Sequence, residues 1–219
     1  MKPFAFSSRL YPIVDALGAT PRSPIELAEA IVASGALLIQ LRLKTEASGR
    51  FVEIARAVKT LADLYGARLI INDRADIAKL VDAAGVHLGQ DDLPVAAARS
   101  ILGPDKIIGC STHNLEQVER ATREGLADYI GFGPIYPTTS KGQPDPVQGL
   151  DGLRTARRAT TLPIVAVGGI TAATMPDTLA AGADAVAMIG EITQAADVQA
   201  KVRELLALPF ATTTSWSHP

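Results

Sequence analysis

The chain has 219 residues, of which 47% are hydrophobic, and it carries a net charge of −2 at pH 7. This composition supports a sizeable buried core and excludes a disordered chain, while the scattered basic residues argue against nucleic acid or a membrane surface as a partner. The single cysteine, Cys110, excludes an internal disulfide, and no apolar run approaches the roughly 20 residues that a membrane span needs.

Short β-rich runs alternate with longer amphipathic stretches along the chain. We predict strands over residues 9–15, 37–43, 68–73, 85–90, 106–112, 128–133, 163–169 and 183–190. We predict helices over residues 23–34, 50–66, 95–102, 114–125, 150–159, 171–182 and 197–208. Several helices end at a glycine a few residues before the next strand, which indicates βα units. Eight such units predict the α/β class and a single (β/α)8 TIM barrel; the alternative is an open, doubly wound sheet.

The two ends of the chain carry different signals. The first residues lack a long apolar run before a small-residue cleavage site, so we expect a cytoplasmic protein without a secretory signal. The last residues, "SWSHP", break the helical pattern and look like the start of an affinity tag. We therefore predict one domain over residues 1–210 and a tag-like tail over 211–219. The sequence leaves the oligomeric state undecided, and a homo-oligomer stays open.

Polar residues alternate along the second predicted strand. Gln40, Arg42 and Lys44 share one face of this strand, because side chains alternate with a period of two, and leucines and an isoleucine share the other. An antiparallel strand with one solvated face could look the same. In a parallel barrel the outer face packs on helices, so the polar face must point into the barrel mouth. Charged groups there are expected to bind a ligand, because unpaired buried charge is costly.

Acidic residues follow the third and fourth predicted strands, in Asn72-Asp73 and in Gln90-Asp91-Asp92. Any one of these acids could be an ordinary turn residue or helix cap, and we assign Asp91 to that role. Carboxylates at the ends of neighbouring strands, opposite cationic side chains, suit Mg²⁺, which takes one or two carboxylates and leaves positions for phosphate oxygens. Zinc is disfavoured, because the histidines and the cysteine lack a metal-ligand spacing.

Hydroxyl and imidazole groups follow the fifth predicted strand, in Ser111, Thr112 and His113. The hydroxyls could serve as helix caps alone, and His113 could be an acid, a base or a hydrogen-bond donor. His87, inside the fourth strand, is expected to be a packed residue that supports the site.

A connection far longer than usual for a βα loop follows the sixth strand, with Thr138, Thr139, Ser140 and Lys141 at its centre. We interpret it as an anion clamp or lid, with a surface insertion as the alternative. The seventh strand ends in Gly168-Gly169 and the eighth in Ile189-Gly190. Backbone N–H groups can approach an anion there, where such barrels often bind phosphate.

Six motifs in this order and spacing resemble the thiamine phosphate synthase family: "QLRLK", "IIND", "GVHLGQDD", "GCSTHN", "DYIGFGPIYPTTSK" and "PIVAVGGIT". The resemblance covers residues 9–207. It implies a TIM barrel that joins 4-amino-5-hydroxymethyl-2-methylpyrimidine diphosphate to a thiazole phosphate, giving thiamine phosphate and pyrophosphate with Mg²⁺ as cofactor. These small molecules would be its partners.

The resemblance also implies a role for each matching residue. Gln40, Arg42, Lys44 and Asn72 would contact the pyrimidine diphosphate, and Asp73 and Asp92 would ligate Mg²⁺. Ser111 would lie beside the reacting pyrimidine, Lys141 would bind the leaving pyrophosphate, and both would be catalytic together with Arg42. The thiazole phosphate would lie against Thr138, Ser140, Gly168, Ile189 and Gly190.

Two positions depart from the family pattern. Ser140 stands where members usually have threonine, and it keeps the hydroxyl. Glu191 stands where relatives more often have a small apolar residue, and it would oppose an anion if it faced the phosphate. Glu191 leaves a catalytically silent phosphate-binding barrel as one alternative. A thiazole tautomerase of the same fold is the other, although such relatives tend to lose the metal acids and the loop lysine, which are present here as Asp73, Asp92 and Lys141.

Overall fold

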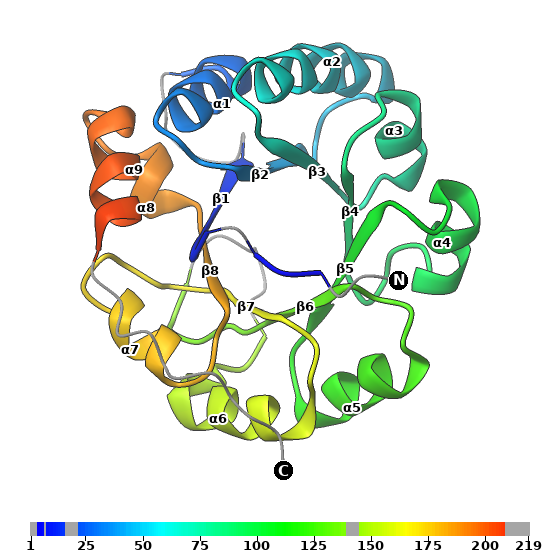
Figure 1. The fold of residues 1–219 in the computed structure, drawn as a ribbon, viewed down its shortest axis with the longest axis vertical. Helices are drawn as coiled ribbons and strands as arrows, with labels where there is room; N and C mark the ends of the chain where they lie inside the picture. Colours follow the sequence, from blue (N-terminus) through cyan, green and yellow to red (C-terminus); the bar gives the residue numbers. More distant parts are fainter. Residues whose placement is uncertain (1–3, 7, 16–21, 139–144, 209–219) are drawn as a thin grey trace.

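The computed structural model describes residues 4–6, 8–15, 22–138 and 145–208. Within these residues, parallel strands pair in sequence order and the eighth also pairs with the first, so the sheet is a closed barrel (Figure 1). The strands are β1 (Leu10–Asp15), β2 (Leu38–Arg42), β3 (Arg68–Asn72), β4 (Gly85–Leu88), β5 (Ile107–Thr112), β6 (Tyr129–Phe132), β7 (Ile164–Ala166) and β8 (Ala185–Met188). The predicted (β/α)8 barrel is confirmed, and closure excludes the doubly wound sheet.

Helices surround the barrel on its outside (Figure 1). They are α1 (Pro24–Ala33), α2 (Ser48–Leu64), α3 (Ala75–Leu80), α4 (Val95–Leu102), α5 (Leu115–Glu124), α6 (Gly149–Ala159), α7 (Met175–Ala180), α8 (Gly190–Thr193) and α9 (Val198–Ala207). The sequence did not predict α3, which has six residues, or α8, whose four residues are too few to show a helical period. No helix among the described residues is long and apolar enough to cross a bilayer.

Local signals in the sequence explain where two of the helices begin. Ser23 and Glu26 form a capping box at α1, in which each side chain accepts a hydrogen bond from the other residue's backbone N–H. At α5, the Asn114 side chain accepts a hydrogen bond from the Gln117 N–H at 3.0 Å, and Gly125 ends the helix with φ +61°.

Two hydrophobic layers lie on either side of the barrel wall. Ile39, Leu41 and Leu43 belong to the layer between the sheet and the helices, as their parity predicts. The layer inside the barrel includes Tyr11 and Tyr129, whose side chains are fully enclosed. Because these layers fix the register of β2, its polar residues must point inward.

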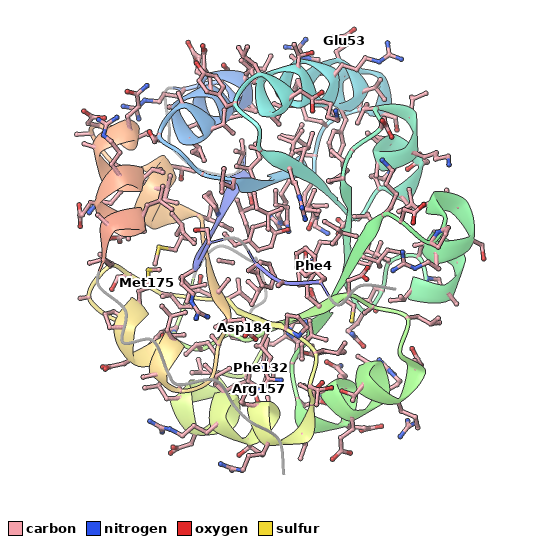
Figure 2. All side chains as sticks on the ribbon, in the orientation of Figure 1. Phe4, Glu53, Phe132, Arg157, Met175 and Asp184 are labelled. Atoms are coloured by element: carbon pink, nitrogen blue, oxygen red, sulfur yellow. The ribbon has the colours of Figure 1, made fainter. Side chains whose placement is uncertain are left out.

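Residues 4–6 lie at the end of the barrel at which the strands begin. They lie across the barrel in Figure 1, and Phe4 lies over the barrel centre in Figure 2. The rings of Phe4 and Phe6 lie 5.7 and 5.4 Å from the ring of Tyr129, measured between centroids. Aromatic contact at these distances shields the interior from water on this side.

An arginine–aspartate pair recurs in two βα units at this same end of the barrel. Arg99 of α4 contacts Asp128 at 2.7 Å, and Arg157 of α6 contacts Asp184 at 3.0 Å. Figure 2 labels both residues of the second pair. Each aspartate also accepts a hydrogen bond from a backbone N–H near the start of a strand. The donor is Ile108 of β5 for Asp128 and Ile164 of β7 for Asp184. The two pairs therefore tie helices to strand starts, away from the end where TIM barrels perform chemistry.

We expect Arg99→Met to lower the free energy of unfolding by about 2 kcal/mol, because Asp128 and several backbone carbonyls lose a half-buried donor. Urea denaturation measures this change. Arg123→Met, which removes an exposed arginine from the last turn of α5, is the matched control and should have little effect. Equal losses in the two variants would contradict the role of the pair.

Candidate active site

A cavity of about 540 Å³ opens where the strands end, and every strand contributes to its lining. Most residues predicted to bind substrate lie along it. These are Gln40, Arg42, Asn72, Ser111, Thr138, Gly168, Ile189 and Gly190. Predicted residues Ser140 and Lys141 lie outside the described residues. The structure therefore brings together side chains and loops from strand ends that are up to 150 residues apart in sequence.

Arg42 enters the cavity from the end of β2 and is held there by Asp15. The two residues are partners in the register of β1 and β2, and their side chains form an ion pair. Only 1% of the Asp15 side chain is exposed, against 13% for Arg42. Sequence reasoning missed Asp15, although an acid at the end of β1, next to the end of β2, was a signal that could have revealed it. A buried pair of this kind fixes where the guanidinium points.

Two carboxyl groups meet beside the cavity, as the strand-end argument predicted. The carboxyl group of Asp73 lies close enough to Asp92 to interact with it and forms an ion pair with Lys44. Burial, reinforced by the neighbouring Asp92, raises the pKa of Asp73 to about 6, although Lys44 acts in the opposite direction. A carboxyl group whose pKa is raised by folding costs stability at neutral pH, because its charged form is disfavoured there. A cation between the two groups would remove that cost.

Backbone geometry also presents the two carboxyl groups to each other. Asp73 has φ +65°, which is uncommon for a residue with a side chain, and its N–H donates to the His87 carbonyl at 2.8 Å. Asp92 accepts the Gly89 N–H at 2.7 Å. In the part of the chain that the structure describes, no three His, Cys, Asp or Glu residues form a metal-binding group. Two carboxylates alone match the donor set of Mg²⁺, which keeps positions for water and phosphate oxygens.

The end of β5 supplies one polar group to the cavity and uses its neighbours for structure. Ser111 lines the cavity and hydrogen-bonds His87 at 3.0 Å. His87, which the sequence predicted to be a packed residue, is half-buried and lines the cavity as well. Thr112 instead donates to the buried Gly131 carbonyl. His113 lines the cavity, and its Nδ1 donates to the Gly133 carbonyl at 2.9 Å. This contact holds Nδ1 and so fixes the orientation of the His113 ring, in which Nε2 is the nitrogen that does not contact Gly133.

The loop after β6 packs against the end of β7 through glycines. The N–H of Tyr136 donates to the Gly168 carbonyl at 2.9 Å. Gly168 and Gly169 have φ of +99° and +64°, and a Cβ on Gly168 would lie 2.6 Å from Pro134. These backbone angles also end β7 three residues before the predicted limit. The glycines therefore let two loops meet at one end of the cavity.

The sequence and fold of this chain match known proteins over most of its length. The family model described as "Thiamine monophosphate synthase" matches residues 10–192. The chain belongs to this family. It is 44% identical to a thiamine-phosphate synthase of Chloroflexus aurantiacus over 204 residues, covering 93% of this chain and 94% of that protein. A second such relative, from Shouchella clausii, is 48% identical over 171 residues, 78% of this chain and 79% of the relative.

A solved member of the same family has the same fold. The thiamine phosphate pyrophosphorylase of Pyrococcus furiosus superposes with a TM-score of 0.81 at 35% identity, covering 90% of this chain and 93% of that chain. The resemblance drawn from the six motifs is thereby confirmed at the level of the family.

Glu191, the position that departs from the family pattern, lies at the cavity and contacts a backbone N–H and an ammonium group that Glu204 shares. Its carboxylate accepts the Ala172 N–H at 3.2 Å and lies 3.7 Å from the Lys201 ammonium. Together these contacts connect α8 to the loop after β7 and to α9. A carboxylate with these partners opposes a nearby anion less than an isolated one would, because the ammonium offsets its field.

Gly168→Ala is expected to lower the free energy of unfolding of the protein by about 2–3 kcal/mol, because the added methyl group would clash with Pro134. The same clash should displace the loop after β6. Gly103→Ala is a matched control: its φ is +86°, but no atom lies within 4 Å of the added Cβ. The difference in unfolding free energy between the two variants isolates the clash from the backbone strain. Similar values for both would show that the close packing against Pro134 is not important.

Proposed function

We propose that the chain is a thiamine-phosphate synthase, which condenses an aminopyrimidine diphosphate with a thiazole phosphate and releases pyrophosphate. The observation that carries the proposal is one cavity near which the sequence places two different groups of residues suited to anions. Arg42 lines the cavity near the end of β2, Lys44 and the pair of aspartates follow the ends of β2, β3 and β4 outside the lining, and the glycine loops after β7 and β8 line another part of the cavity. Family membership supports the same reaction. The comparisons do not favour the tautomerase or the silent barrel.

The chemistry asks the protein to hold charge and to align two rings. Loss of pyrophosphate from the aminopyrimidine leaves a methylene cation, which the electron-rich ring stabilises and the thiazole nitrogen attacks. Arg42, Lys44 and Lys141 would neutralise the leaving group, and Asn72 would orient it. Asp73 and Asp92 would hold Mg²⁺, which when bound would add charge stabilisation on the leaving pyrophosphate.

The other substrate would lie at the glycine end of the cavity. Its phosphate would meet Thr138, Ser140 and the backbone near Gly168, with the N-terminus of the short helix α8 at Gly190. Ser111 would face the pyrimidine between the two ends. Such alignment in a water-poor cavity is worth several kcal/mol of barrier, so no protein nucleophile is required. We further propose that the protein works in the cytoplasm on these small molecules.

Pyrophosphate release with both substrates and Mg²⁺ tests the proposal directly. We expect release that requires both substrates and that stops with excess chelator and returns with added Mg²⁺. Release that continues in excess chelator would contradict the magnesium assignment. Isomerisation of the thiazole without pyrophosphate would favour the tautomerase, and binding of phosphate without turnover would favour the silent barrel.

A further inference from the structure

Five polar side chains form a continuous hydrogen-bonded chain through the barrel interior. Gln40 Nε2 donates to Tyr11 Oη at 3.1 Å, and Tyr11 Oη lies 2.9 Å from Tyr129 Oη. Tyr129 Oη then lies 3.0 Å from His87 Nδ1, and His87 Nε2 lies 3.0 Å from Ser111 Oγ. Gln40, Tyr11, His87 and Ser111 all line the cavity, and Tyr129, which connects Tyr11 to His87, is the member of the chain that does not.

The sequence makes room for this chain with glycines in neighbouring strands. Gly109 pairs with Tyr129 across β5 and β6, and a Cβ on Gly109 would lie 2.1 Å from the Tyr129 ring. A Cβ on Gly131 would lie 3.1 Å from the His87 ring. Phe4 and Phe6 cover the tyrosines from the opposite side. Glycines in β5 and β6 thus leave the space that the rings of Tyr129 and His87 occupy inside the barrel.

The donor at one end of the chain determines the order of all the others. Tyr11 accepts a hydrogen bond from Gln40, so the order that uses every phenol O–H has Tyr11 donating to Tyr129 and Tyr129 donating to His87 Nδ1. This order requires His87 to carry its proton on Nε2 and to donate a hydrogen bond to Ser111. Burial raises the pKa of both tyrosines above the ordinary value, so both phenols keep their protons.

We propose that Tyr11, Tyr129 and His87 are positioning residues, which transmit the orientation of the Gln40 amide to Ser111 and keep the Ser111 O–H free to be donated into the cavity. Ser111 accepts from His87 and does not use its own proton on it, so that proton is available to an acceptor atom of a ligand. This part rests on the proposed function: with an aminopyrimidine in the cavity, the acceptor would be a ring nitrogen, and the contact would set the orientation of the ring.

The tautomers of the histidine rings test the order without any substrate. Long-range ¹H–¹⁵N NMR at mildly alkaline pH should show His87 protonated on Nε2. His113 is an internal reference for the other tautomer, with the proton on Nδ1, because its Nδ1 donates to a backbone carbonyl. The chain has three histidines, so the spectrum is simple to assign with one substitution at each. A wild-type protein with His87 protonated on Nδ1 would overturn the proposal.

Gln40→Glu should reverse the order at a distance. A carboxylate only accepts, so Tyr11 must donate to it, Tyr129 to Tyr11, and His87 to Tyr129 from Nδ1. The proton of His87 is therefore expected to move from Nε2 to Nδ1, although Gln40 and His87 are separated by two tyrosines. Adding Tyr129→Phe removes the connecting hydroxyl and should cancel the switch. Tyr65→Phe, at the exposed end of α2, is the matched control and should leave it in place.

If the His87 proton stays on Nε2 in Gln40→Glu, or still moves to Nδ1 when Tyr129→Phe is added to Gln40→Glu, the transmitted order is overturned. In the kinetic arm, Tyr129→Phe should lower kcat/KM about tenfold, the loss expected for one oriented hydrogen bond, whereas Tyr65→Phe should not. Unchanged kcat/KM in Tyr129→Phe would contradict positioning. The NMR result needs no turnover, so it stands or fails separately from the pyrophosphate assay.

Discussion

Replacement of Asp92 by asparagine is expected to lower kcat/KM for pyrophosphate release at least about a hundredfold. Asparagine keeps an oxygen for the Gly89 N–H, so the turn after β4 should keep its shape. What is lost is one of the two carboxylates that face each other beside the cavity, and with it a charged ligand of the proposed Mg²⁺ site. Turnover measured over a range of Mg²⁺ concentrations, together with urea denaturation, separates weakened metal binding from damage to the fold.

Asp91→Asn supplies the control within the same turn. Asp91 is exposed, whereas Asp92 is half-buried, and only Asp92 contacts Asp73. Both substitutions remove one negative charge from neighbouring positions, so a general electrostatic effect would act on both. We expect a loss confined to Asp92→Asn and partly recovered by excess Mg²⁺. Comparable losses in the two variants, or full activity of Asp92→Asn, would contradict the assignment of Asp92 as a metal ligand.

The barrel and most of its mouth follow from local patterns in the sequence. Period two along β2 was enough to place Gln40 and Arg42 inside, because a parallel barrel leaves only one face for polar groups. Asp73 and Asp92 were predicted to meet for a similar reason: each follows a strand, and the strands are neighbours in the sheet. These inferences need strand order and parity, which a sequence encodes directly.

Contacts across the barrel interior could not be predicted in the same way. Tyr11 and Tyr129 lie on β1 and β6, which are not neighbours in the sheet, and their contact depends on closure and on the exact tilt of the strands. The pair of Asp15 and Arg42 is different, because it joins the ends of the neighbouring strands β1 and β2, and the acid at the end of β1 was a sequence signal for it. The electrostatic effect of Glu191 could not be predicted from the sequence either. It depends on the distance to Lys201 of α9, and periodicity does not give that distance.

Arg42→Met is expected to damage the protein in two separable ways. Asp15 is nearly fully buried and would lose its guanidinium partner, which should lower the free energy of unfolding by about 3 kcal/mol. The proposed diphosphate end of the cavity would also lose a fixed cation, which should lower kcat/KM at least about a hundredfold. Urea denaturation and pyrophosphate release measure the two effects independently.

The double variant Asp15→Asn/Arg42→Met distinguishes the two effects, because it removes the buried charge together with its partner. Replacing a buried ion pair by neutral groups costs far less than removing one member, so stability should return most of the way to wild type. Turnover should stay low, since neither substitution restores a cation at the end of β2. Recovery of turnover along with stability would mean that Arg42 serves the fold alone. Stability restored without turnover would show that one side chain both neutralises Asp15 and serves catalysis, with the buried acid as the support that holds the guanidinium in place.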